Sequence, residues 1–378
     1  MAETFIHGRD DWPSFRWDND GLFVRLNNVA YRAGLLNGRL QSLGVTDRDE
    51  TILDAAVADI VGSSAIEGER LDPVEVRSSV ARSLGMGFAG LPSPARQIQG
   101  VVAMALDATE RFTEPLSAER LFGWNAVLFP TGYSGFFPIR VGAWRDDARG
   151  PMQVVSGPIG RETVHFQAPP ADRLPAEMAG FLDWFEGGPK TNPYLHAAVA
   201  HLWFVTIHPF DDGNGRIGRA VLDMALARAE RTARRAYSLS AGILAERDRY
   251  YEVLEEAQRG DLDITIYLGW FLDLLERVLQ GAEGTIARSL WRSDFWHRHR
   301  ETDLNDRQRR VLTRLLGDFR GPVTNEKWRK LTHATRDTAL RDLNDLVQKG
   351  ILAVEGERKG ARYRLVNDLP EPSPESGA

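Results

Sequence analysis

The sequence predicts a mainly α-helical protein that carries one β-hairpin and a small basic C-terminal domain. Over most of the first 300 residues, apolar side chains recur at steps of three and four, which is typical of amphipathic helices. Residues 131–170 break this pattern with glycines, prolines and two short β-branched runs. Residues 303–366 carry a net charge of +6 in a chain whose total is −6, so the C-terminal part is a separate electrostatic body.

Length and composition narrow the class of protein. A chain of 378 residues, 43% apolar and 26% charged, has room for two or three ordinary globular domains. It contains no cysteine, which excludes disulfides, thiolate metal sites and a cysteine nucleophile. The N-terminus carries charges and no apolar run of signal-peptide length, and no stretch has the roughly 18 apolar residues of a membrane span. We therefore expect a soluble cytoplasmic protein without membrane contact.

The elements follow from the local patterns. Between two β-branched runs, 152–155 and 163–166, the turn-forming residues 156–160 predict a hairpin. A long helical stretch is predicted from about 250 to 299. The earlier helices are predicted over 22–43, 50–66, 94–112, 117–129, 175–185, 193–207 and 216–231.

The segment 208–219, HPFDDGNGRIGR, is predicted to join a helix end to a helix start. Pro209 disfavours the α conformation for the residue before it, so the preceding helix should end near His208. The next helix begins with free N–H groups and a positive dipole end, which together bind phosphate. The backbone freedom for this turn comes from Gly213, Asn214 and Gly215.

Four side chains of this segment suit phosphoryl-type transfer. Arg216 and Arg219 share one face of the second helix and offer planar donor forks to phosphate oxygens. Asp212 supplies a carboxylate, and Mg²⁺ often needs only one or two protein carboxylates when substrate phosphates complete its shell. His208 has an ordinary pKa suited to accepting a hydroxyl proton near neutral pH.

All fixed positions of this segment match the signature of the Fic family, which the chain resembles over roughly residues 5–285. The resemblance implies a protein adenylyltransferase that moves AMP from ATP to Ser, Thr or Tyr of a target protein and releases pyrophosphate. ATP is then the substrate and Mg²⁺ the cofactor. His208 is implied to be the general base, and Asp212 to hold Mg²⁺. The ATP phosphates are implied to contact Gly213, Asn214, Gly215, Arg216, Ile217, Gly218 and Arg219.

Two further elements resemble parts of this family. The predicted hairpin is similar to the flap that holds the target segment as an added strand, which assigns Val164, His165 and Phe166 to target binding; a plain core hairpin is the alternative. The adenine side is implied to involve Tyr250, Tyr251 and Gln258. The family often has Asn at the last of these positions.

The segment SSAIEGER resembles the family's inhibitory pattern, with Ser63, Glu67 and Gly68 at its fixed positions. In relatives the glutamate pairs with the second arginine of the signature, which is Arg219 in this sequence. The γ-phosphate of ATP then cannot bind. Some relatives use the same glutamate to position water that removes AMP from a target, so the sequence leaves the reverse reaction, de-AMPylation, open.

The basic C-terminal segment resembles a winged helix-turn-helix, with three helices and a two-stranded wing. DNA binding and docking of a protein or a second copy are both open for such a module. The alternative function is therefore a DNA-binding regulator that uses the Fic core as a nucleotide sensor. A target protein is the expected partner, and both self-modification and a homodimer are left open. The apolar stripe of the third helix should face inward; it comprises Ala339, Leu340, Leu343, Leu346 and Val347.

These patterns give four expected parts of the chain. They are an N-terminal helical domain with the inhibitory pattern at 1–92, a Fic catalytic core at 93–300, a winged helix-turn-helix at 301–368 and a disordered tail at 369–378.

Overall fold

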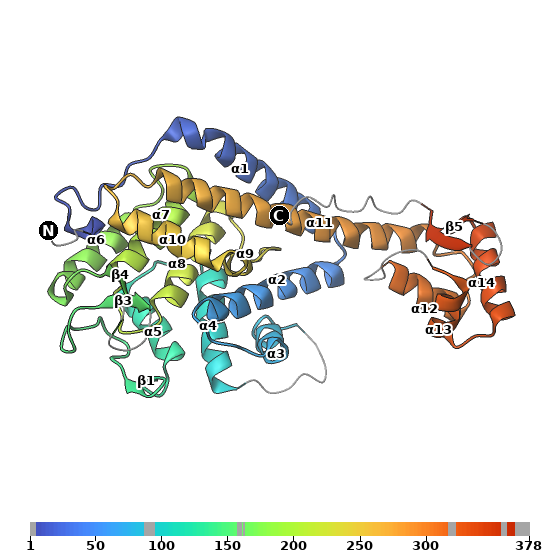
Figure 1. Ribbon diagram of the computed structural model, residues 1–378, viewed down its shortest axis with the longest axis horizontal. Helices are drawn as coiled ribbons and strands as arrows, with labels where there is room; N and C mark the ends of the chain where they lie inside the picture. Colours follow the sequence, from blue (N-terminus) through green and yellow to red (C-terminus); the bar gives the residue numbers. More distant parts are fainter. Residues whose placement is uncertain are drawn as a thin grey trace. The chain divides into compact units, whose positions relative to one another are not determined.

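The computed structural model describes residues 5–86, 95–156, 161, 163–316, 323–356 and 361–366. The chain divides into two units, Met1–Glu283 and Gly284–Ala378. The described residues form fourteen α-helices and three two-stranded antiparallel sheets, so the predicted mainly α-helical fold is confirmed (Figure 1). Among them, no helix is both long and apolar enough to cross a membrane. The expected tail at 369–378 lies outside the described residues.

Two helices form the centre of the first unit. Helix α7 (Pro193–Ile207) begins at Asn192, whose side chain accepts a hydrogen bond from the Tyr194 N–H, and it is buried along nearly its whole length. Helix α8 (Asn214–Glu230) packs directly against it and is also buried over most of its residues. Helices that are apolar all round belong in a core. The loop between α7 and α8 is therefore anchored in the core of the unit.

The other helices of the first unit surround this pair (Figure 1). Helices α1 and α11 run side by side, joined by ion pairs such as Arg25–Asp273 at 2.7 Å. Helix α2 packs against α3 and α9, and α4 packs against α5 and α8. Their bounds are α1 (Asn19–Gln41), α2 (Val45–Ile66), α3 (Pro73–Ser83), α4 (Arg96–Glu110), α5 (Ala118–Leu128), α6 (Leu174–Glu186), α9 (Leu239–Ala245), α10 (Arg247–Arg259) and α11 (Thr265–Arg298).

The predicted hairpin is present. Strands β3 (Gln153–Ser156) and β4 (Thr163–Gln167) pair antiparallel, with Val154 opposite Phe166 and an irregularity before the next pair. Residues 157–160 of the predicted turn lie outside the described residues, as does residue 162. A second short hairpin, β1 (Tyr133–Ser134) and β2 (Phe137–Pro138), was not predicted, because two-residue strands carry no periodicity.

The prediction of one continuous helical stretch from 250 to 299 is wrong. Helix α10 ends at Arg259 and α11 begins at Thr265, and Leu262 between them has a left-handed backbone with φ 75°. The side chain of Asp263 accepts a hydrogen bond from the Thr265 N–H at 2.9 Å and so starts the new helix. Helices α3 and α9 were also missed, although Asp72 followed by Pro73 is a recognisable helix start.

The second unit contains the three predicted helices and a hairpin. They are α12 (Asp306–Leu315), α13 (Asn325–Thr332), α14 (Arg336–Gln348), β5 (Leu352–Glu355) and β6 (Arg362–Leu365). Trp328 is fully buried in their common core. Leu340 was expected to face inward but is 44% exposed, because it lies about 100° round the helix from the buried Ala339. That this unit is a winged helix-turn-helix stays a prediction.

Candidate active site

Packing and hydrogen bonds hold the loop between α7 and α8 along its length. Helix α7 ends at Ile207, as predicted, and His208 caps it in a left-handed conformation with φ 52° and ψ 59°. Phe210 is fully buried and packs on Trp144, with ring centroids 5.2 Å apart. The Asn214 side chain accepts from the Phe210 N–H at 2.9 Å and donates to the Phe210 carbonyl at 2.7 Å. These contacts fix the loop before any ligand binds.

The imidazole of His208 has a defined orientation. Its Nδ1 lies 3.1 Å from the carbonyl oxygen of Val205. A carbonyl only accepts hydrogen bonds, so Nδ1 carries the proton and Nε2 keeps its lone pair. Burial lowers the pKa of His208 below its ordinary value, although the Val205 hydrogen bond opposes this shift. The ring is therefore neutral at pH 7.

The first turn of α8 presents donors without partners. Its N-cap is Gly213, which has φ 87° and no side chain to bond the first N–H groups. Among the described residues, Nε of Arg216 and Nη1 of Arg219 are buried and have no hydrogen-bond partner. Both guanidinium groups are also largely buried. Buried donors that lack acceptors are costly, so an anionic ligand here would be stabilised.

The carboxylate of Asp212 lies at the edge of the loop. It accepts hydrogen bonds from the Gly213 N–H at 2.5 Å and from the Ser134 hydroxyl, and its backbone carbonyl accepts from Asn125 at 3.2 Å. In the described part of the chain, no group of three or more His, Asp or Glu side chains has an arrangement that could hold a metal ion. Asp212 alone therefore fits a cation that substrate phosphates also coordinate.

Arg219 is clasped by the C-terminal end of α2. Its Nη2 donates to Oε1 of Glu67 at 2.9 Å and to the Ser63 carbonyl at 2.7 Å, and its Nε donates to the Ser63 hydroxyl at 2.9 Å. Burial opposes the charge of Arg219, yet Glu67 together with Tyr250 raises its pKa above the ordinary value. The residues of the predicted inhibitory pattern thus meet the second arginine of the loop.

The Glu67 carboxylate also covers the first turn of α8. A Cβ built on Gly215 would lie 2.0 Å from Oε1 of Glu67, so the carboxylate rests directly on the glycine backbone. Gly68 follows with φ 83° and ends α2 sharply. Beside this contact, Glu69 accepts from Nη1 of Arg216 at 2.8 Å. Both arginines therefore have acidic partners from the same segment.

The predicted adenine-side residues differ in exposure, although the rings of Tyr250 and Tyr251 lie side by side with centroids 5.2 Å apart. Tyr250 and Gln258 are buried and bond across to α7, to His201 at 3.2 Å and Thr206 at 3.3 Å respectively. Tyr251 is 37% exposed, and its hydroxyl lies 3.3 Å from the carbonyl of Ile66, near Glu67. Only Tyr251 thus borders the loop region with an accessible ring.

The residues of the predicted flap are bonded to helix α10. Arg259 donates to the carbonyls of Val164 at 3.0 Å and His165 at 3.2 Å, and Nδ1 of His165 lies 2.8 Å from Glu255. Phe166 is buried beside Phe5. Phe166 of strand β4 therefore belongs to a small hydrophobic core rather than to an exposed binding edge.

Three buried or partly buried residues near the loop were not singled out from the sequence. Asn125 and Ser134 hold Asp212, and Arg145 donates to the His208 carbonyl at 2.8 Å.

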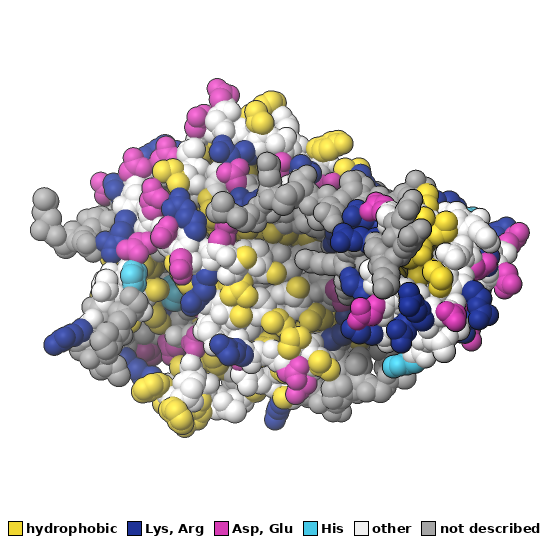
Figure 2. Space-filling view, turned by 45° about the vertical axis from the view of Figure 1, so that its right-hand side comes forward, with side chains coloured by type: hydrophobic (Ala, Val, Ile, Leu, Met, Phe, Trp, Pro, Cys, Tyr) yellow, Lys and Arg dark blue, Asp and Glu magenta, His cyan; other side chains and the backbone are white. Residues whose placement is uncertain are grey.

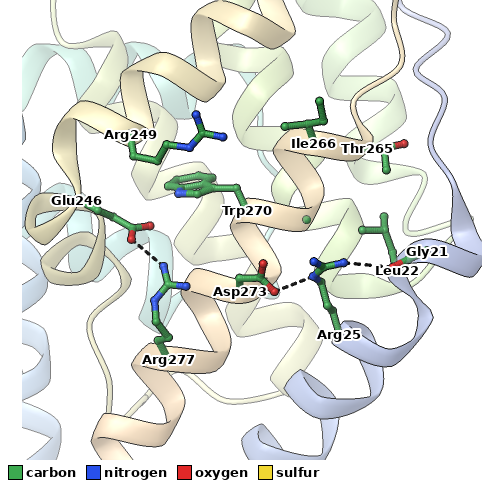
Figure 3. Close-up of a pocket in the computed structure, with 11 residues that line it drawn as sticks. Gly21, Leu22, Arg25, Glu246, Arg249, Thr265, Ile266, Trp270, Asp273 and Arg277 are labelled. Atoms are coloured by element: carbon green, nitrogen blue, oxygen red, sulfur yellow. Dashed lines mark hydrogen bonds and ion pairs between the residues drawn. The ribbon is translucent and has the colours of Figure 1, made fainter. Parts of the chain in front are cut away.

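A shallow groove lies elsewhere on the first unit, between α1, α10 and α11 (Figure 3). Its volume is about 660 Å³, and Trp270 lies at its centre. Arg25 pairs with Asp273 and Arg277 with Glu246, both at 2.7 Å. None of the predicted site residues lines it.

Comparison with family models finds two matches. Residues 115–226 match the Fic/DOC family, and residues 5–86 match a domain of unknown function, DUF4172. The first match contains the whole loop from His208 to Arg219.

Comparison with curated proteins finds relatives over the same part of the chain. The protein adenylyltransferase Fic of Drosophila willistoni is 34% identical over 117 residues, covering 30% of this chain and 22% of that protein. A uridine 5'-monophosphate transferase of Xanthomonas campestris pv. campestris is 32% identical over 122 residues, covering 30% and 21%. The alignment thus spans about a fifth of each relative's length.

Comparison with solved structures extends further along the chain. A Fic family protein of Desulfovibrio desulfuricans superposes with a TM-score of 0.52 and 23% identity, over 92% of this chain and 97% of that one. At this level of identity the likeness concerns the fold.

Proposed function

On the premise that this chain contains a Fic/DOC-family domain, we propose that it is a protein adenylyltransferase. It transfers AMP from ATP to a Ser, Thr or Tyr hydroxyl of a target protein and releases pyrophosphate. One observation carries this proposal: a neutral, oriented imidazole lies at one end of the loop, and at the other end two arginines each keep one buried nitrogen donor without an acceptor. Relatives named as nucleotide-monophosphate transferases support the same chemistry.

His208 acts as the general base. Nε2 takes the proton from the acceptor hydroxyl while that oxygen attacks the α-phosphorus of ATP. The bond from the α-phosphorus to the bridging oxygen breaks, and pyrophosphate leaves with the electron pair. The Val205 hydrogen bond supports this role because it fixes the tautomer in which Nε2 is the acceptor.

The triphosphate binds at the start of α8. Its oxygens accept hydrogen bonds from the N–H groups of the first turn and from Arg216 and Arg219, whose Nε and Nη1 respectively lack acceptors. Asp212 would hold Mg²⁺ there, and the ion would neutralise charge on the phosphates. Tyr251 is the adenine-side residue that we retain in the proposal, because its ring is accessible.

Glu67 restrains the reaction. While its carboxylate bonds to Arg219 at 2.9 Å, this arginine is not free for the γ-phosphate. The same carboxylate lies over the Gly215 backbone, where phosphate would approach. We propose that ATP binds productively only when Glu67 moves away, and that Glu67 also positions water if the reverse reaction occurs.

The test is transfer of label from nucleotide to protein. Wild type should transfer label from ATP labelled in the α-phosphate, in the presence of Mg²⁺, to itself or to a protein in a lysate. UTP labelled in its α-phosphate should transfer much less label to protein than ATP does. His208→Ala should lose transfer by about 10²- to 10⁴-fold while still binding ATP. Labelling of His208→Ala equal to that of the wild type would refute the mechanism. Preferential labelling from UTP would show that UTP, not ATP, is the nucleotide substrate.

A second candidate function is DNA binding by the second unit. Arg329, Arg336 and Arg341 are exposed on α13 and α14, and dark blue basic side chains are visible over this unit in Figure 2. Phosphate contacts by such residues make binding salt-dependent.

Salt-dependent retention on duplex DNA tests this candidate. The double variant Arg336→Ala/Arg341→Ala should elute at lower salt than the wild type. The matched control is Arg70→Ala/Arg231→Ala, which removes the same charge from exposed positions of the first unit. Elution of both double variants at the same salt would argue against a DNA-binding face on α14.

A further inference from the structure

Arg145 is a fully buried cation between two segments of the candidate site. It lies in the stretch between the two hairpins, next to Trp144, which packs on the loop residue Phe210. A buried guanidinium is expensive unless its N–H groups are bonded and its charge is compensated. The hydrogen-bond acceptors and the ion-pair partner of Arg145 therefore indicate its role.

On one side Arg145 holds the residues that follow α7. Its Nε donates to the carbonyl of His208 at 2.8 Å, and its own backbone N–H donates to the carbonyl of Pro209 at 2.9 Å. His208 has positive φ, a conformation that costs non-glycine residues free energy and needs support from its surroundings. Arg145 supplies that support on the backbone.

On the other side Arg145 holds the chain that leaves β4. Its Nη2 donates to the carbonyl of Pro169 at 2.5 Å. Its Nη1 pairs with Asp147 at 2.9 Å, and the other oxygen of Asp147 accepts from the Ala171 N–H at 2.7 Å. The planar fork of one arginine thus joins the catalytic loop to the exit of the β3–β4 hairpin.

We propose that Arg145 is a positioning residue that sets the distance between His208 and the segment leaving the β3–β4 hairpin. The inference rests on the proposed function, in which His208 accepts the proton of the acceptor hydroxyl, and on the predicted role of this hairpin in holding the target segment. A displacement of about 1 Å between the two can lower a rate about 100-fold. The nucleotide contacts on α8 do not involve Arg145, so its loss should affect turnover rather than ATP affinity.

The experiment compares Arg145→Met, Arg145→Lys and a control, Arg140→Met, in the full chain. Arg140 lies five residues earlier, and its side chain pairs with Asp146 at the surface. Arg145→Met should lower kcat for protein labelling by about 10- to 100-fold, with the KM for ATP within about twofold of wild type. Arg145→Lys keeps the charge, but its single ammonium group can contact only one of the two segments. Its kcat should therefore lie between those of Arg145→Met and the wild type. Arg140→Met should behave as wild type.

A kcat within twofold of wild type in Arg145→Met, or a KM for ATP that rises as kcat falls, would overturn the inference. Should Arg145→Met not fold, Arg145→Lys carries the test, and a wild-type kcat in it overturns the inference.

Hydrogen exchange separates this inference from the proposed function. Arg145→Met or Arg145→Lys should speed amide exchange both at Ala168 and Ala171 and at Phe210 and Asp211, while Arg140→Met should change neither pair. Unchanged exchange at either segment would contradict the role of Arg145 in joining the two segments. Failure of the wild type to transfer any nucleotide would instead overturn the proposed function. The exchange result would still decide whether Arg145 joins the two segments.

Discussion

His208 combines an orientation and a pKa that suit a base working at neutral and mildly acidic pH. Burial is the main cause of its lowered pKa, and the charge of Arg145 acts in the same direction. The Val205 hydrogen bond and the negative charges of Glu67 and Asp212 oppose the shift. The net direction is downward, so protonation of the base requires a pH below the ordinary value of 6.5.

The pH dependence of turnover follows from this direction. A base with a lowered pKa is unprotonated above that pKa, so activity should persist to lower pH and fall only below 6.5. We expect kcat at saturating ATP and Mg²⁺, measured from pH 5 to 8, to reach half its plateau below pH 6.5. An acidic limb centred above 6.5 would contradict the assignment of the buried His208 as the base.

The pair formed by Glu67 and Arg219 makes a second prediction at this scale. Glu67→Gly removes the carboxylate, while Ser63 still accepts two hydrogen bonds from Arg219 and keeps it in place. Self-labelling should rise about tenfold to a hundredfold, the range of typical coupling free energies. Arg219→Ala should not rise, because it removes the restraint and the phosphate ligand together.

The comparison uses the same labelled ATP for all variants. Glu50→Gly is the matched control, since it places the same substitution at an exposed position of the same helix. It should label as wild type does. Weaker or equal labelling in a folded Glu67→Gly protein would argue against autoinhibition.

At the scale of elements, α2 decides where Ser63 and Glu67 lie. Asp59 on this helix accepts hydrogen bonds from the Ser238 hydroxyl at 2.9 Å and the Ser240 N–H at 2.9 Å, at the start of α9. One turn later, a Cβ on Gly62 would lie 2.9 Å from the backbone nitrogen of Ala241. Helix α2 therefore approaches α9 as closely as two backbones allow.

Gly62→Ala should separate these helices. Backbone atoms cannot give way as a flexible side chain does, so we expect a loss of about 1–3 kcal/mol in the free energy of unfolding. The end of α2 should move with it, and self-labelling should increase as Glu67 leaves Arg219. Gly38→Ala on α1 meets open space and should stabilise by about 0.5–1 kcal/mol. Urea unfolding and labelling of both variants check this, and equal stability of the two would contradict the close approach.

Sequence patterns predicted the elements that have strong periodicity and missed those set by single contacts. The end of α7 at His208 followed from Pro209, and the β3–β4 hairpin followed from its β-branched runs. The break between α10 and α11 depends on Asp263 bonding to the start of α11, which periodicity does not report.

The same limit applies to the site. The loop residues could be predicted because they are contiguous in the sequence, whereas Arg145 and Asn125 reach the loop from distant positions through tertiary packing. Tyr250 and Gln258 looked suited to a ligand, but packing uses them to hold α10 against α7.

At the scale of the whole molecule, every residue of the candidate site belongs to the first unit. The second unit has its own core, to which Trp291, Phe295 and Trp296 of α11 contribute. Its expected basic character, together with the opposite charge of the rest of the chain, is consistent with two separate roles.

Deleting residues 300–378 tests whether the two units are functionally separate. Labelling per folded molecule should stay within about twofold of the full chain, because the loop, the hairpin and Glu67 all remain. The truncation strips the partners from the aromatic residues at the end of α11, so we expect self-association from the exposed apolar surface. Light scattering measures that association, and Trp291→Ser together with Phe295→Ser in the same truncation should reduce it. A monodisperse, folded but inactive truncation would show instead that the second unit completes the active site.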